Sequence, residues 1–327
     1  MKICNKTIGR GEKAYISLFI GKMCNDTTLA IPLTVINGYE EGPVLCVVGG
    51  VHGDEYEGPC AISEIIRELD PKKLKGTFIG VPVLNILAYR WGSRVTPDDK
   101  KNLARVFPGK KDGTITEKIA YTFTKEIITK SDYIIDLHSG GTDYSYANML
   151  CYFDVPGDVG KESLELAEMF PISIIFRSLE KPVGRLIDTA INEGVPSMGT
   201  ECKGEGRYRE EDKNLYILGI KNVMKKLNMI DGDIIGLPKK RTFVDLIEIK
   251  SEHEGFLKTH LEPGQYIKKG EILGTLVNIF DTEICKFKAE NDGIVLAIKT
   301  KPIVKPGDCV FILGKEYTSG KYWPKVK

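Results

Sequence analysis

Apolar residues in the first half of the chain alternate between short continuous runs and helical spacing. Residues 44–48 form an apolar run of the length expected for a buried strand. Residues 57–69 instead have apolar side chains at three- and four-residue intervals, at Ile62, Ile65, Ile66 and Leu69. This second spacing places the apolar side chains on one face of a helix. A buried strand followed by an amphipathic helix is the unit from which parallel sheets are built.

The same alternation continues to about residue 228, where the last predicted helix ends. Further strands are predicted over residues 77–84, 132–137, 172–176 and 196–201. Helices are predicted after a capping box at Thr114 and Glu117, from Leu186 to Gly194, and around residues 217–227. This order of elements predicts an α/β fold with a mainly parallel sheet. The chain before Val44 also has strand-like patterns, and we expect it at an edge of that sheet.

The pattern changes near residues 230–244, which are rich in turn-forming residues. Residues 262–278 and 291–314 then combine Pro-Gly turns with short apolar strands, and the segment shows no helical spacing. We therefore expect two domains, an α/β domain over residues 1–235 and a small all-β domain over residues 236–327.

Composition narrows the classes of partner and the expected location. The formal net charge of +1 provides no broad basic surface for nucleic acid or anionic membranes. The sequence has no apolar run long enough to span a bilayer and no secretory signal at its start. Its eight cysteines form no CxxC pair. Together these features predict a cytoplasmic protein with reduced thiols.

Two of the four histidines lie just beyond the carboxyl ends of predicted strands. His52 and Glu55 lie in GGVHGDEYEGP (residues 49–59), and His138 lies in DLHSGG (residues 136–141). Open α/β sheets bind ligands at the carboxyl ends of their strands. Two imidazoles and a carboxylate are a typical zinc ligand set that leaves a fourth position for water. A histidine after one strand is more often a packed turn residue, but the three residues together favour a metal site.

These motifs, with NLARVFPG (residues 102–109) and GTEC (residues 199–202), occur in the order and spacing of a known family. The chain resembles the aspartoacylase/succinylglutamate desuccinylase family of carboxypeptidase A-like zinc hydrolases over roughly residues 40–320. The resemblance implies a three-layer α/β/α zinc-hydrolase domain. It also implies one Zn²⁺ per chain, held by His52, Glu55 and His138.

The resemblance also assigns catalytic and substrate-binding residues. Glu201 matches the family's catalytic glutamate, although Glu205 is a rival four residues later. A carboxylate there can take a proton from water and return it to the leaving amine. Arg94 looks like the arginine that stabilises the oxyanion. Asn102 and Arg105 correspond to the substrate-binding pair, in which the guanidinium binds a carboxylate.

One residue departs from the family pattern. The common motif Asn-Leu-Asn-Arg is here Asn102-Leu103-Ala104-Arg105, so one side-chain contact to the substrate is missing. The hydrolase prediction is unaffected, but the motif leaves open whether the substrate carries an α-carboxylate. Asp136, two residues before His138, is expected either to orient that histidine or to be a buried structural residue.

The C-terminal segment resembles the barrel-sandwich fold of biotinyl and lipoyl domains. It lacks their lysine context near residues 278–288, so no such group is expected, and we expect a wall of the active site or an oligomer interface instead. The predicted function is zinc-dependent hydrolysis of the amide bond of a small N-acylated amino acid or amine. The alternatives are a metallocarboxypeptidase acting on short peptides and a metal-binding protein without turnover.

Overall fold

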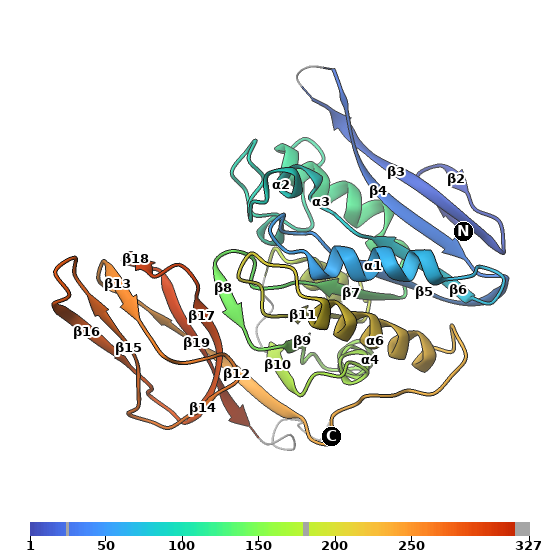
Figure 1. The fold of residues 1–327 in the computed structure, drawn as a ribbon. Coiled ribbons are helices and arrows are strands. Elements are labelled where there is room, and N and C mark those ends of the chain that lie inside the picture. The colour runs from blue at the N-terminus through green and yellow to red at the C-terminus, as the bar shows by residue number, and fades with distance from the viewer. Residues whose placement is uncertain (24–25, 179–182, 318–327) are drawn as a thin grey trace.

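The computed structural model describes residues 1–23, 26–178 and 183–317. Its centre is a thirteen-stranded sheet, with most helices on its two faces (Figure 1). From the N-terminal edge inward the strands are β3 (Glu12–Lys22), β4 (Thr28–Asn37), β6 (Lys75–Val81), β5 (Glu40–Val48), β7 (Tyr133–Leu137), β11 (Ser197–Glu201), β9 (Met149–Phe153) and β10 (Ile174–Ser178). The predicted α/β class is therefore confirmed, as is the position of the N-terminal strands at an edge of the sheet.

The sheet is mainly parallel where it carries the candidate site. Strand β5 pairs in parallel with β6 and β7, and β7 pairs in parallel with β11. Strand β9 runs antiparallel to β11 and parallel to β10. The carboxyl ends of β5, β7 and β11 therefore lie side by side, at the same end of these three neighbouring strands.

Helices cover both faces of the sheet because its side chains alternate between two hydrophobic clusters. Leu45 and Val47 of β5 pack in the cluster that includes helices α1 (Glu57–Glu68), α4 (Asp158–Glu168) and α6 (Glu210–Lys226). Cys46 and Val48 face the other cluster, which includes α3 (Ile115–Glu126) and α5 (Leu186–Asn192). The domain is thus a three-layer arrangement in which helices cover both faces of the central strands of the sheet.

The C-terminal strands continue the main sheet. Strand β12 (Thr242–Lys250) pairs in parallel with β10, and β19 (Cys309–Tyr317), β17 (Gly293–Lys299) and β14 (Tyr266–Ile267) extend the sheet beyond it. A second sheet contains β16 (Glu283–Lys288), β15 (Ile272–Val277), β13 (Gly255–Lys258) and β18 (Ile303–Val304). The two sheets enclose a separate core that includes Leu276 and Phe311. The C-terminal part thus has its own core but is hydrogen-bonded into the large sheet, so the expected separate unit shares a sheet with the first domain. The division near residue 235 stays a prediction.

Several elements differ from the sequence-based prediction. The strand predicted over 77–84 ends at Val81, immediately before Pro82. Helix α4, strand β9 and the short helix α2 (Ile86–Trp91) were not predicted. The remaining short elements are β1 (Lys2–Ile3), β2 (Lys6–Thr7), β8 (Tyr144–Tyr146), and the 3₁₀ turns η1 (Leu103–Arg105) and η2 (Ile128–Lys130).

Residues 1–23, 26–178 and 183–317 contain neither a candidate membrane-spanning helix nor a disulfide bond. No helix in those ranges is long and apolar enough to cross a bilayer. Seven cysteines within them are free thiols, and Cys24 lies outside the described residues.

Candidate active site

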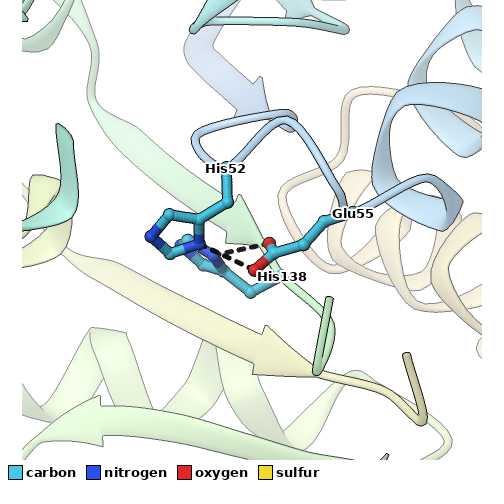
Figure 2. A group of neighbouring side chains, drawn as sticks. All are labelled: His52, Glu55 and His138. Carbon is cyan, nitrogen blue, oxygen red and sulfur yellow. Dashed lines mark hydrogen bonds and ion pairs between the residues drawn. The ribbon is translucent and has the colours of Figure 1, made fainter. Parts of the chain in front are cut away.

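His52, Glu55 and His138 converge at the carboxyl ends of β5 and β7 (Figure 2). His52 Nδ1 lies 2.7 Å from one carboxylate oxygen of Glu55, and His138 Nδ1 lies 2.9 Å from the other. Potential ligand atoms of the three residues all lie within 4.8 Å of one another. His52 and Glu55 are each 2% exposed, so this carboxylate and imidazole are out of bulk water. The arrangement presents three ligand atoms toward one point.

The outer nitrogens of both imidazoles have polar partners. His52 Nε2 lies 3.0 Å from the Asn102 side-chain oxygen, and His138 Nε2 lies 3.1 Å from Asp136. Such contacts fix the orientation of a ligating imidazole and leave Nδ1 toward the metal. Of the two roles considered for Asp136, the structure supports the orienting one. Asn102 contacts His52, a role the sequence did not indicate, and its role in substrate binding stays a prediction.

The electrostatics of the three residues suit a cation. Burial lowers the pKa of His52, which favours the neutral imidazole that binds metals. Burial also opposes charge on His138, but Asp136 and Glu55 outweigh it and raise the pKa of His138 well above its ordinary value. The two imidazoles lower the pKa of Glu55 despite its burial, so that carboxylate is ionised. Ligand type, proximity and orientation therefore all fit a metal ion.

The loops that carry these ligands are tied together by close backbone approaches. The Gly53 N–H donates to the Ser93 carbonyl at 2.9 Å. A Cβ at Gly53 would lie 2.1 Å from the backbone of Ala88, so only glycine fits directly after His52. On the other side, Asp54 accepts hydrogen bonds from the backbone and hydroxyl of Thr142 at 2.8 and 3.0 Å. The Gly53 contacts thus join the His52 loop to residues 88–93, and the Asp54 contacts set the distance between the His52 loop and the His138 loop.

Glu201 is the last residue of β11, which pairs with β7, the strand that ends at Leu137 directly before His138. Burial raises the pKa of Glu201 to about 8, although His138 and Arg94 oppose the shift. Its Oε2 atom is buried and has no hydrogen-bond partner among the described residues. Glu205 instead bonds Ser145 and pairs with Arg209. Of the two glutamates, Glu201 is therefore the one available to exchange a proton in the site.

Arg94 also lies within the site. Its guanidinium contacts Glu55 at 3.4 Å, and 32% of the side chain remains exposed. Burial opposes its charge, but Glu55 and Glu201 outweigh burial and raise the pKa of Arg94. This guanidinium therefore stays charged beside the candidate ligands.

Arg105 lies on the exposed side of the site. Its guanidinium donates to the Ala104 carbonyl at 2.8 Å. Burial and the positive charges of Arg94 and Arg185 lower the pKa of Arg105. The sequence did not single out Arg185, which is brought near by the packing of Gly184 against the Arg105 backbone. Arg94 and Arg185 are paired with Glu55 and Asp188, at 3.4 and 3.0 Å, whereas Arg105 forms no ion pair with a carboxylate of the described residues.

A second group of potential ligands lies at the start of two packed helices. Glu57, Cys202 and Asp212 are buried and close together. Glu57 accepts from the Arg209 N–H at 3.1 Å, and Asp212 accepts from Asn148 at 3.0 Å. Both carboxylates lie in the first turns of α1 and α6, where helix N-termini stabilise negative charge. One oxygen of each carboxylate, Glu57 Oε2 and Asp212 Oδ2, is buried and has no hydrogen-bond partner among the described residues.

Comparison with known proteins identifies the family. A family model described as the succinylglutamate desuccinylase/aspartoacylase catalytic domain matches residues 41–227. The chain therefore belongs to this family. The expected resemblance is confirmed over more than half of the sequence.

Individual relatives span nearly the whole chain. N-alpha-acetyl-L-2,4-diaminobutyric acid deacetylase of Halomonas elongata is 29% identical over 293 residues, covering 87% of this chain and 85% of that protein. The product-bound ectoine utilization protein EutE (DoeB) of Ruegeria pomeroyi has a TM-score of 0.86 and 27% identity, covering 94% of this chain and 97% of its own. A succinylglutamate desuccinylase/aspartoacylase of Rhodobacter sphaeroides has a TM-score of 0.87 and 25% identity, with coverages of 97% and 100%. The chain is thus homologous to enzymes that remove acyl groups.

Proposed function

We propose that this protein is a zinc-dependent deacylase that hydrolyses the amide bond of a small N-acylated amino acid. The observation that carries the proposal is the position of Glu201, a buried carboxylate with an unpartnered oxygen, beside the three converging residues His52, Glu55 and His138. The name of the Halomonas elongata relative points to N-acetylated diamino acids as the first substrates to test.

The residues have distinct roles in this reaction. His52, Glu55 and His138 would hold the zinc ion, which would supply Lewis-acid polarisation of the scissile carbonyl, a lower pKa of the attacking water and a positive charge that favours the ionised form of Glu201. Glu201 takes a proton from the water as the new C–O bond forms. It then gives that proton to the amine nitrogen as the C–N bond breaks. Arg94 donates to the oxygen that becomes negative, and the products are a carboxylate and a free amine.

Arg105 is proposed to bind the carboxylate of the substrate. Ala104 beside it is 5% exposed and packs in a hydrophobic cluster, so it adds no polar contact. Arg105→Ala should therefore reduce kcat/KM for an N-acetyl amino acid far more than for its primary amide, by roughly tenfold or more. Kinetics of this matched pair of substrates on both proteins would check the role. Equal losses for the acid and the amide would exclude Arg105 as the carboxylate-binding residue.

The function itself is tested by amine release from a panel of substrates. Zinc-loaded protein should hydrolyse N-acetyl-2,4-diaminobutyrate or another N-acyl amino acid in the panel, and it should leave short unblocked peptides intact. Cleavage of the peptides at their carboxyl ends would instead support a metallocarboxypeptidase. Absence of any hydrolysis, with zinc bound, would support a metal-binding protein without turnover.

A further inference from the structure

Strand β8 connects the candidate active site to the C-terminal strands. It runs beside β17, with Tyr146 opposite Ala297 (Figure 1). On its other side, the Tyr146 N–H donates to the carbonyl of Lys203, two residues after Glu201, at 3.0 Å. The next residue, Ala147, donates to the Leu296 carbonyl at 2.7 Å. The Tyr146 backbone is therefore held between the Glu201 segment and strand β17 of the main sheet.

The side chains of β8 divide into two sets. Ser145 is buried and donates to Glu205 at 2.7 Å. Tyr144 and Tyr146 point to the opposite face, and their ring centroids are 5.8 Å apart. The two tyrosines differ in one respect, because only the Tyr144 hydroxyl has a partner. It donates to the carbonyl of Cys309, the first residue of β19, at 3.1 Å.

The Tyr146 hydroxyl is free within the described part of the chain. It makes no hydrogen bond to residues 1–23, 26–178 or 183–317. Its oxygen atom is not fully buried. The side chain is only partly buried. A tyrosine with a packed ring and an accessible, unbonded hydroxyl can donate a hydrogen bond to a molecule in the site.

The charged residues near Tyr146 are Glu201 and Arg94, which both have proposed roles in the reaction. Burial raises the pKa of Tyr146 well above its ordinary value, the Glu201 charge raises it further, and Arg94 opposes the shift. The hydroxyl therefore stays protonated and can donate at physiological pH. Glu201 and Arg94, proposed as general base and as donor to the oxyanion, are thus the charged neighbours of this side chain, on a strand whose backbone contacts Lys203, two residues after Glu201.

We propose that Tyr146 is a further catalytic residue, whose hydroxyl donates a hydrogen bond to the substrate carbonyl oxygen alongside Arg94. This assignment rests on the proposed deacylase function. The bond would strengthen as the oxygen becomes negative, so it stabilises the transition state more than the bound substrate. It also gives the C-terminal strands a role in catalysis, because β17 pairs with β8, the strand that carries this hydroxyl.

The test compares Tyr146→Phe with Tyr144→Phe in the zinc-loaded full chain. Each substitution keeps the ring and removes one hydroxyl. Loss of one oxyanion donor typically lowers kcat by about 10²–10³-fold, and Tyr146→Phe should show such a loss with KM and Tm little changed. Tyr144→Phe loses a bond to the backbone, so it should lower Tm while kcat stays close to that of the wild type. Zinc content should be the same in all three proteins.

The outcomes separate this inference from the function on which it rests. If the wild type hydrolyses N-acetyl-2,4-diaminobutyrate and the two variants have the same kcat, Tyr146 is not a catalytic residue and the deacylase assignment stands. A rise in KM for Tyr146→Phe with unchanged kcat would also overturn the assignment to the oxyanion. If the zinc-loaded wild type hydrolyses no N-acyl amino acid at all, the proposed function fails, and the role of Tyr146 fails with it.

Discussion

At the residue scale, the environments of two neighbouring glutamates determine their chemistry. Glu55 and Glu201 are both buried, but burial raises the pKa of Glu201 to about 8 while the two imidazoles lower the pKa of Glu55. The Glu55 carboxylate is thereby kept ionised, as the proposed role of metal ligand requires. The other has a pKa close to neutrality, where a group can both accept and donate a proton.

This difference predicts the effect of removing the proton-transfer group. Glu201→Gln should retain zinc and fold but lower kcat by about 10²–10⁴-fold, the usual contribution of a positioned general base. Glu205→Gln is the matched control, because Glu205 bonds Ser145 and Arg209 away from the ligands. Near-normal turnover in Glu201→Gln, or a comparable loss in Glu205→Gln, would move the role of general base elsewhere.

At the element scale, the site depends on how closely the loops after β5 and β7 approach each other. Gly141 has a φ of 54°, and a Cβ there would lie 2.6 Å from Asp54 Oδ2. Asp54 in turn accepts hydrogen bonds from Thr142. A side chain at position 141 would therefore push apart the two loops that carry the ligands.

Gly141→Ala should consequently weaken zinc binding by roughly tenfold or more, as for other changes in groups that orient metal ligands. Gly194→Ala is the matched control for backbone strain. Its φ is 79°, but a Cβ there would meet nothing within 4 Å. Competition for zinc with a chelator of known affinity would measure both variants. Equal affinities in the two variants would show that backbone strain, and not the approach to Asp54, controls the site.

At the scale of the whole molecule, one sheet passes through both predicted domains. Strand β12 pairs with β10, and β17 pairs with β8 (Figure 1). Removing the C-terminal strands would expose the β10 edge and leave β8 without its partner. The two parts should therefore unfold together.

This continuity predicts a single cooperative thermal transition for the full chain. Calorimetry should give one peak, with a calorimetric enthalpy equal to the van't Hoff enthalpy. This prediction depends on the shared sheet and not on the candidate site. His52→Ala, which changes only one residue of that site, is the control and should also give a single peak. Two separated peaks in the wild type would show that the C-terminal strands form an independent unit.

The sequence predicted the elements with strong periodicity and the residues that carry familiar chemistry. The strand-end histidines were visible because His52 and His138 each follow an apolar run. Strand β8 was not visible, because three residues are too few to show a period. The pairing of β10 with β12 and the approach of Arg185 to Arg105 join distant parts of the chain, so local patterns do not reveal them.

The most direct test of the central claim is the metal content of the protein and of one ligand variant. Elemental analysis of protein prepared without chelators should find about one zinc ion per chain in the wild type, because the three ligands converge on a single point. His52→Ala should retain little of it. A wild type that contains no transition metal, or a His52→Ala variant that keeps a full equivalent, would contradict the assignment of His52, Glu55 and His138 as the metal site.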